Sequence, residues 1–344
     1  PPPPPNYTQV NSSAASDVYK RQVDSSAPAP APGEVLVATR AAALNYRDLL
    51  FTEGRYGGDQ PETRVPLSDG AGDVVAVGDG VQGFAVGDRV TAPHFLNWID
   101  GAFSPAATAA DVGISRDGWL SELVLLPAGS LIRLPDGMDY ADAAALGVAG
   151  ITAWSVVEAL GNIKPSDTVL TLGTGGVATV ALQIAKMNGA RVAITSSSDE
   201  KLELVRELGA DITVNYRKNP QWEQAVREAT GGRGVDIVVE TVGFGTLPQS
   251  LACCAPNARV GLLGGLDSGA GKPMNLSALY FGNLVVKGIT SGSRQMYEDL
   301  LVASAQNGLK PYIDQRFAFA DAKDAYRHLA EAGHVGKVLI DRFA

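Results

Sequence analysis

The sequence predicts an α/β protein in two parts, a β-rich first domain followed by a doubly wound parallel sheet. Short apolar runs separated by Gly and Asp turns fill the chain from Glu34 to about residue 135, which is typical of strands joined by tight turns. After Pro165, apolar runs recur every 20 to 25 residues with helical patterns between them. That alternation indicates parallel strands linked by helices, and a length of 344 residues leaves room for two domains.

The second domain is expected to hold six parallel strands. Their apolar runs lie at Val169–Leu172, Val192–Thr195, Ile212–Asn215, Ile237–Glu240, Val260–Leu263 and Leu284–Lys287. Helical patterns fall between them at Val177–Met187, Glu200–Leu208 and Trp222–Ala229. The last stretch, from Met296 to Phe343, predicts two helices and a closing strand that returns to the first domain.

These changes of pattern also set the domain boundaries. Residues 1–32 are rich in Pro, Ser and Ala, so they bury too little surface to offset their ordering entropy, and we predict a flexible arm. Residues 33–145 form the first part of the β-rich domain, 146–290 the parallel-sheet domain, and 291–344 the return to the first domain.

The composition excludes several classes of protein. The 37 acidic residues outnumber the 28 Lys and Arg residues, so the net charge of −9 disfavours nucleic-acid binding. The two cysteines, Cys253 and Cys254, are adjacent, which excludes a disulfide framework and a cysteine-rich zinc knuckle. We expect them in an apolar helix, where buried thiols are inert.

The sequence shows no targeting or membrane-spanning segment. The stretch Asn6–Gln22 is polar and lacks the apolar region of a signal peptide. The most apolar window, Ala143–Val157, is interrupted by glycines and is shorter than the roughly 20 residues that span a bilayer, so we interpret it as a buried helix. We therefore expect a soluble, cytoplasmic protein with no membrane partner.

A glycine-rich turn between the first strand and the first helix of the parallel region carries the clearest functional signal. Gly173, Gly175 and Ala178 fit the dinucleotide fingerprint, in which one Gly makes the tight turn and another admits the pyrophosphate. Thr174, Gly176 and Val177 complete the predicted phosphate loop. The alternative is a structural turn with no ligand.

The end of the second strand favours NADPH over NADH. An NAD site usually places Asp or Glu about 20 residues after the glycines, where it binds the ribose 2′-hydroxyl. This chain has Ser196 and Ser197 there, and Lys201 follows within reach of a 2′-phosphate. Asp199 and Glu200 are explained as charges that favour the N-terminus of the following helix. The remaining predicted cofactor-binding residues are Tyr216, with Arg217 beside it, and Val242, Leu263 and Gly264.

Several stretches form a pattern typical of one family: Ala43–Asp48, Pro66–Gly72, Val86–Val90, Gly150–Trp154, the Gly173 loop and Gly336–Ile340. With these stretches and that order of elements, the chain resembles the medium-chain dehydrogenase/reductase superfamily, in the zinc-free branch that includes quinone oxidoreductases. The resemblance implies a GroES-like β-rich catalytic domain, a Rossmann domain and an active site between them. It also implies a homodimer formed through the edge strand Leu284–Ile289.

The residues at the metal positions of zinc-dependent relatives differ in this chain. Those relatives carry a cysteine ligand where this chain has Asn45, and a His-Glu pair where it has Ser68-Asp69. The segment His94–Ala110 also lacks the four cysteines of their structural zinc lobe. Since catalytic zinc needs three protein ligands, we expect no zinc and assign no metal-binding residue. The three histidines show no ligand spacing.

Without a Lewis acid, negative charge must spread over the acceptor or be met by hydrogen-bond donors. Quinones and α,β-unsaturated carbonyls spread the charge by conjugation. The resemblance places Asn45 and Tyr56 beside substrate and nicotinamide, and Thr152 near the nicotinamide, although Thr152 also fits a hydroxyl inside a helix. Leu50 stands where the family has a second aromatic residue.

The sequence thus predicts an NADPH-dependent oxidoreductase that passes hydride to quinones or α,β-unsaturated carbonyls without zinc. Two alternatives stay open. One is an alcohol dehydrogenase-like enzyme acting on simple aldehydes and alcohols, and the other is an NADPH-binding protein without turnover.

Overall fold

The computed structural model describes residues 6–11, 21–56, 63–265 and 276–342. The chain divides into two compact units, of which the first comprises residues 1–149 and 293–344 and the second residues 150–292. The observed boundaries between the units therefore fall at residues 149/150 and 292/293. The boundaries predicted from the sequence were 145/146 and 290/291.

The second unit is built on a six-stranded sheet in the order β10-β9-β8-β11-β12-β13. The strands are β8 (Thr168–Leu172), β9 (Arg191–Ser196), β10 (Ile212–Asn215), β11 (Val235–Glu240), β12 (Cys254–Leu262) and β13 (Val285–Gly288). Every pair of neighbours is parallel, as the six apolar runs predicted. The chain winds outward from β8 in one direction and from β11 in the other, so the order reverses between these two central strands.

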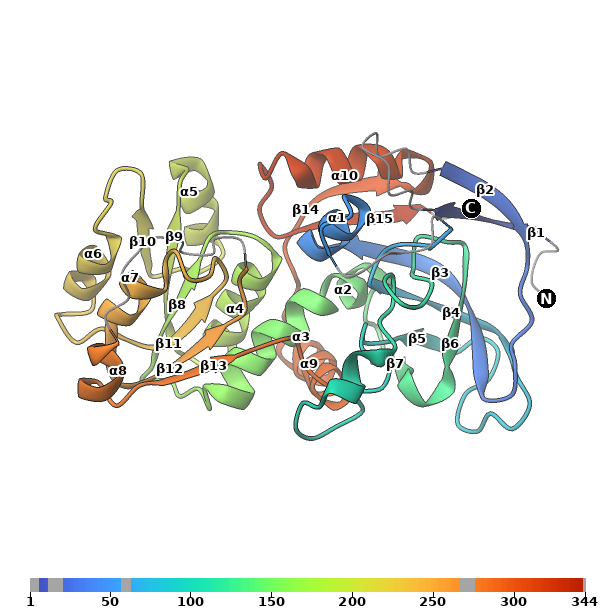
Figure 1. Cartoon of the computed structure of the whole chain (residues 1–344), viewed down its shortest axis with the longest axis horizontal. Helices are drawn as coiled ribbons and strands as arrows, with labels where there is room; N and C mark the ends of the chain where they lie inside the picture. Colours follow the sequence, from blue (N-terminus) through green and yellow to red (C-terminus); the bar gives the residue numbers. More distant parts are fainter. Residues whose placement is uncertain (1–5, 12–20, 57–62, 266–275, 343–344) are drawn as a thin grey trace. The chain divides into compact units, whose positions relative to one another are not determined.

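Helices follow the strands of this sheet, as Figure 1 shows for α5 and α6. Their bounds are α4 (Gly176–Met187), α5 (Asp199–Glu207), α6 (Trp222–Ala229), α7 (Leu247–Ala252) and α8 (Ser277–Phe281), with a π-helix at Ser155–Leu160. Helix α4 packs on β8 and β9, and α5 packs on β9 and β10. Strands β8 and β11 are buried throughout because layers cover both faces, which explains their continuous apolar runs.

The first unit is built on a mixed seven-stranded sheet in the order β14-β15-β3-β4-β5-β7, with β6 paired to β3. The strands are β3 (Glu34–Leu44), β4 (Asp69–Val77), β5 (Arg89–Thr91), β6 (Leu123–Pro127), β7 (Ile132–Arg133), β14 (Ile313–Ala318) and β15 (Lys337–Arg342). Strand β15 lies between β14 and β3, so the last part of the chain completes a sheet begun by the first part. The sequence missed β14, whose residues are only partly buried.

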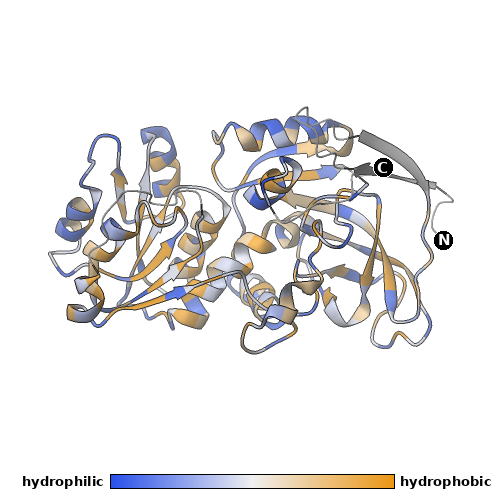
Figure 2. Cartoon of the chain, in the orientation of Figure 1, coloured by the Kyte–Doolittle hydropathy of each residue, from blue (hydrophilic) through white to orange (hydrophobic). Residues whose placement is uncertain are grey.

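Five helices and three 3-10 turns belong to the described part of this unit, counting α3, which runs across the division. The helices are α1 (Tyr46–Thr52), α2 (Tyr140–Ala145), α3 (Val148–Trp154), α9 (Arg294–Asn307) and α10 (Ala322–Ala330). The 3-10 turns are Pro105–Ala109, Ala128–Ser130 and Phe319–Asp321. Figure 2 shows hydrophobic strands beside the mixed, outwardly hydrophilic surface of α10. The core is continuous from the sheet to α10 and centres on the fully buried Trp119.

Trp119 also explains a glycine next to the site described below. A Cβ added to Gly70 would lie 2.3 Å from the Trp119 ring, so only glycine lets β4 pass so close to it. The Gly70 carbonyl accepts a hydrogen bond from Thr91, whose hydroxyl also contacts that of the buried Tyr297. This packing fixes the start of β4, which directly follows Ser68.

Within the segment predicted as a flexible arm, β1 (Asn6–Asn11) and β2 (Arg21–Ser26) pair as antiparallel strands. Ladder hydrogen bonds can satisfy the backbone even where few apolar residues are available.

One local prediction was wrong. The adjacent cysteines do not share a helix: Cys253 caps α7 and Cys254 opens β12. Both thiols are free and buried, and burial raises the pKa of each.

None of the helices in the described ranges combines the length and apolar character needed to cross a bilayer.

Candidate functional site

A buried polar cluster forms in the first unit where α1, β4 and β15 begin. The Lys337 ammonium donates to Asn45 Oδ1 at 2.6 Å and lies 3.4 Å from Asp69 Oδ2. The Asn45 amide nitrogen donates to the same Asp69 oxygen at 2.7 Å. The three side chains therefore form a closed triangle, and their exposed fractions are only 9%, 1% and 2% for Asn45, Asp69 and Lys337.

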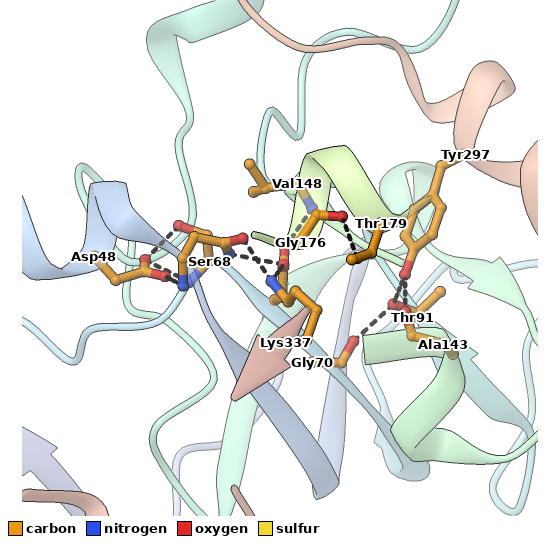
Figure 3. Close-up of polar contacts among 12 residues, drawn as sticks. Asp48, Ser68, Gly70, Thr91, Ala143, Val148, Gly176, Thr179, Tyr297 and Lys337 are labelled. Atoms are coloured by element: carbon orange, nitrogen blue, oxygen red, sulfur yellow. Dashed lines mark hydrogen bonds and ion pairs between the residues drawn. The ribbon is translucent and has the colours of Figure 1, made fainter. Parts of the chain in front are cut away.

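A second carboxylate, that of Asp48, bonds to the backbone of Asn45 and to Ser68 beside this triangle. Asp48 accepts the Asn45 backbone N–H at 2.8 Å through one oxygen, and the Ser68 hydroxyl at 2.7 Å through the other. Figure 3 shows the Asp48 and Ser68 side chains facing each other, with Lys337 nearby. Burial raises the pKa of Asp48 from its ordinary value, against the pull of the Arg47 guanidinium. Asp48 thus ties the start of α1 to the start of β4.

Two glycines make the close approaches possible. The Val148 N–H donates to Asp69 Oδ1 at 2.8 Å, and a Cβ on Gly147 would lie 2.2 Å from that same oxygen. Gly336 has φ +70°, and a Cβ there would meet the Tyr312 carbonyl at 2.2 Å. Gly336 therefore turns the chain so that Lys337 enters β15 with its ammonium directed to the cluster.

The predicted catalytic residues fall into three different surroundings. Asn45 lies in the cluster, but one of the two amide N–H groups attributed to it is already bound by Asp69. Tyr56 is half-buried and lies under the Arg47 guanidinium, 5.1 Å from ring centroid to Cζ. Thr152 is buried in α3 and belongs to the second unit.

Lys337 was not predicted as a site residue. The feature that could have indicated it is a lysine at the first position of an apolar strand, in the stretch Gly336–Ile340 that matches the family. Among the residues that the structure describes, no group of three or more His, Cys, Asp or Glu side chains is placed to hold a metal ion.

The glycine loop of the second unit has the geometry that the fingerprint predicted. Gly173 ends β8 with φ +75°, and its N–H donates to the Thr195 carbonyl of the next strand. Gly175 is the N-cap of α4, and the space where a Cβ would lie is open at both glycines. Ala178 is buried against the sheet. The backbone N–H groups that begin α4 thus follow directly from the end of a central strand, an arrangement that binds phosphates.

The other predicted cofactor residues follow the same edge of the sheet. Ser196 ends β9 and Ser197 follows it, Tyr216 follows β10, Val242 follows β11, and Leu263 and Gly264 follow β12. Thr174 lies in the loop after β8, and Gly176 and Val177 begin α4. Because the strands are parallel, all these segments lie at the carboxyl edge, where doubly wound sheets bind their ligands. The reversal of strand order between β8 and β11 marks the binding point on this edge.

The acidic residues after β9 have partners of their own. Ser198 caps α5 and accepts the Lys201 backbone N–H at 3.3 Å. Asp199 accepts from Asn215 at 2.7 Å and pairs with the Lys218 ammonium, whose hydrogen bond lowers the pKa of Asp199. The Lys201 side chain is half-buried in the first turn of α5. Asp199, the first carboxylate after the predicted ribose-binding serines, is therefore already paired.

Glu240 orders the loop after β11, and the sequence analysis missed it. Its carboxylate is fully buried and accepts the N–H groups of Val242 and Gly243 at 3.0 and 3.1 Å. The hydroxyls of Thr246 and Ser250 donate to it as well. Burial raises the pKa of Glu240, while these four donors oppose the rise. The signal was an acidic residue at the end of an otherwise apolar strand.

The raised pKa of Glu240 predicts how pH changes its contribution to stability. The contribution is complete below the pKa of an unfolded glutamate, about 4.3, and is lost as pH rises through the higher folded pKa. The free energy of unfolding of the wild type relative to Glu240→Gln should therefore be largest near pH 4 and fall toward neutral pH in urea titrations. The exposed Glu207→Gln is the control and should follow the wild type throughout. A Glu240→Gln difference that grows with pH would contradict this assignment.

Comparisons with known proteins agree with this architecture. The family described as "Alcohol dehydrogenase GroES-like domain" matches residues 31–136, and "Zinc-binding dehydrogenase" matches residues 176–306. A zinc-type alcohol dehydrogenase-like protein of Schizosaccharomyces pombe is 40% identical over 316 residues, covering 90% of this chain and 91% of that protein.

Further relatives carry other names. A quinone oxidoreductase of Pseudomonas aeruginosa is 32% identical, covering 90% of this chain and 92% of that protein. An acryloyl-coenzyme A reductase of Metallosphaera sedula is 30% identical, covering 91% and 93%. Among solved structures, a proposed alcohol dehydrogenase from Sinorhizobium meliloti 1021 superposes with a TM-score of 0.92 at 36% identity, covering 98% of this chain and 99% of that one.

Three findings agree on one family. The first unit is GroES-like, the parallel sheet carries a glycine loop at its carboxyl edge, and one relative is 40% identical over nine tenths of both chains. The chain belongs to the medium-chain dehydrogenase/reductase superfamily of NAD(P)-dependent oxidoreductases.

Proposed function

We propose that the protein uses NADPH to reduce quinones or α,β-unsaturated carbonyl compounds, and that it does so without zinc. The observation that carries the zinc-free reaction is the position of Lys337. Its ammonium takes the two side-chain oxygens, Asn45 Oδ1 and Asp69 Oδ2, on which a cation at this site would depend.

The cluster does not fit a zinc ion. Zinc sites use thiolate, imidazole and carboxylate donors in a tetrahedral set, and only Asp69 among the three triangle residues supplies such a donor. A divalent ion there would also lie against the Lys337 ammonium, and two cations at this distance repel strongly in a buried site. One relative is named zinc-type and one matched family is described as zinc-binding, but those names describe other proteins. The donor atoms of this cluster differ from those that a zinc ion needs.

The proposed chemistry needs a hydride donor and a place for negative charge. A bound nicotinamide supplies hydride, which adds to an electron-poor carbon and sends an electron pair to a conjugated oxygen. The Asn45 amide donates a hydrogen bond to that oxygen, and water or the Tyr56 hydroxyl supplies the proton. One hydride and one proton thus convert an enone to the saturated carbonyl compound, or a quinone to the hydroquinone.

The preference for NADPH is supported by the surroundings of Ser196. The first two carboxylates after β9 are already engaged, because Asp199 is bound by Lys218 and Asn215 and Glu200 accepts the Ser198 hydroxyl. The hydroxyls of Ser196 and Ser197 and the ammonium of Lys201 suit a phosphate rather than a ribose hydroxyl.

Replacement of Lys201 by Ala should therefore weaken NADPH far more than NADH. We expect a loss of roughly 1 to 3 kcal/mol in NADPH binding, the range for a charged hydrogen bond, with the NADH Kd nearly unchanged. Fluorescence titration with both cofactors measures this directly. Lys186→Ala is the matched control, since Lys186 pairs with Asp211 at the other end of the sheet. Equal losses for both cofactors would remove the 2′-phosphate argument.

The acceptor class draws support from two relatives. The names of the quinone oxidoreductase and the acryloyl-coenzyme A reductase both describe reduction of a conjugated acceptor. The second candidate is reduction of simple aldehydes or oxidation of alcohols, which the names of the Schizosaccharomyces and Sinorhizobium proteins favour. The third is NADPH binding without turnover.

Anaerobic stopped-flow oxidation of NADPH with quinones, enones and saturated aldehydes separates these candidates. The protein should be treated with chelator, and its zinc content measured in the same samples. We expect rapid oxidation by conjugated acceptors, slow oxidation by saturated aldehydes, and less than stoichiometric zinc before treatment. One zinc per chain with loss of activity on chelation would overturn the proposal. Tight NADPH binding with no turnover on any acceptor would favour the third candidate.

We also propose that the protein is a homodimer formed through β13 and acts in the cytoplasm. Strand β13 is one of the two edge strands of the parallel sheet, and Val285 on it is 49% exposed. Tyr280 and Phe281, in the helix just before it, are 83% and 82% exposed, which is unusual for large apolar residues. A second copy could pair with this edge and cover these side chains. The free thiols Cys253 and Cys254 suit a reducing compartment.

Light scattering during size-exclusion chromatography tests the dimer. The wild type should show twice the chain mass of 35.8 kDa, and Val285→Lys should show the chain mass, because a lysine on an edge strand opposes pairing. Val302→Lys, at a 43% exposed valine on α9, is the control and should stay dimeric. A monomeric wild type would contradict this arrangement.

A further inference from the structure

Lys337 is a buried cation, and no step of the proposed reaction described above involves it directly. Its side chain is 2% exposed, and its ammonium contacts an amide oxygen and a carboxylate. Lysine is almost never fully buried unless it is paired, so its burial has to be explained by the groups around it. Those groups are Asn45 and Asp69.

The charges on either side determine which way the Asn45 amide faces. Its oxygen lies on the Lys337 ammonium, and its nitrogen lies on the Asp69 carboxylate. The flipped amide would place N–H groups against the ammonium and an oxygen against the carboxylate, so both contacts would become repulsive. Asn45 therefore has one allowed orientation.

That orientation leaves one amide N–H of Asn45 available. An amide nitrogen carries two hydrogens, and the bond to Asp69 uses one of them. No other hydrogen bond from this nitrogen is found within the described ranges. A cation on the amide oxygen draws electron density from the nitrogen, which makes the remaining N–H a stronger donor.

We infer that Lys337 is a positioning residue that, together with Asp69, fixes the Asn45 amide and strengthens its remaining N–H as a donor to the oxygen of the acceptor. This inference rests on the proposed function for the identity of the acceptor. It makes the site selective for acceptors whose reducible system ends in an oxygen. It also means that the acceptor does not have to disperse all of the incoming charge by itself.

Several charged groups surround the ammonium and set its state. The carboxylates of Asp69 and Asp48 favour the charged form, whereas burial lowers the pKa of Lys337 from its ordinary value. Arg47 is a second cation near Asp48, and it pairs with a third carboxylate, Asp111. The Lys337 ammonium is balanced by the Asp69 carboxylate, 3.4 Å away.

The kinetic test compares Lys337→Met, Lys337→Arg, Asn45→Ala and the double variant Asn45→Ala/Lys337→Met. Lys337→Met should lower kcat at least about tenfold, less than the roughly 10²-fold that removal of a direct oxyanion donor can cost. The NADPH Kd should stay within about twofold, since the cofactor loop belongs to the other unit. Lys337→Arg should recover much of the loss because it keeps the charge.

The double variant distinguishes positioning from a separate structural role. If Lys337 acts through Asn45, the double variant should be no slower than Asn45→Ala alone. Losses that multiply, or an unchanged kcat in Lys337→Met, would overturn the inference. Lys323→Met, an exposed lysine on α10, is the control and should behave as the wild type.

A measurement without turnover keeps the inference testable if Lys337→Met does not fold or if no acceptor is reduced. Nitrogen-15 NMR of the wild type at neutral pH should show a protonated Lys337 amine. It should also show an Asn45 side-chain amide whose two protons are well separated, and that signal should move in Lys337→Arg. A neutral amine, or amide protons averaged by rotation, would overturn the inference. Failure of the acceptor panel with these signals present would count against the proposed function alone.

Discussion

The first unit depends on one buried ammonium. Lys337 joins the start of β15 to the N-cap of α1 and to the start of β4 through Asn45 and Asp69. Without Lys337, the buried Asp69 carboxylate would lose its ion pair, and an uncompensated buried charge costs several kcal/mol. The ammonium offsets part of that cost, and the hydrogen bonds to Ser68 and Val148 satisfy the remaining carboxylate oxygens.

The same contact connects stability with chemistry. A site built to take up negative charge in the transition state works best when its donors are fixed before the reaction begins. Here an amide is held between a cation and an anion, so its orientation is set before any reaction begins. Under the proposed function, charge compensation would come from within the chain rather than from a metal ion.

The second unit was largely predictable from the sequence, because its signals are local. Each strand is a short apolar run, and the turn at Gly173 and Gly175 follows the first of them directly. Glu240 was not predicted as an ordering residue, since its four donors come from a loop whose path the sequence pattern does not reveal. Cys254 opens a strand rather than continuing a helix, because the bond between Val235 and the Cys253 carbonyl draws the chain into the sheet.

The candidate site of the first unit was predictable only in part. Asn45 was predicted as a catalytic residue, whereas Asp69 was noted only as standing at a metal position of zinc-dependent relatives. Their contacts with Lys337 join residues 292 and 268 positions apart. Periodicity cannot indicate such a contact, and a lysine at the start of a strand is normally solvated. The partly polar run of β14 was missed for a related reason: an edge strand buries too little to show strict alternation.

Neutron diffraction from crystals of the metal-free protein at neutral pH tests the central claim most directly. We expect three hydrogen or deuterium atoms on the Lys337 nitrogen, with the oxygen of Asn45 facing it and the nitrogen of Asn45 facing Asp69. A neutral lysine, or an amide turned the other way, would contradict it.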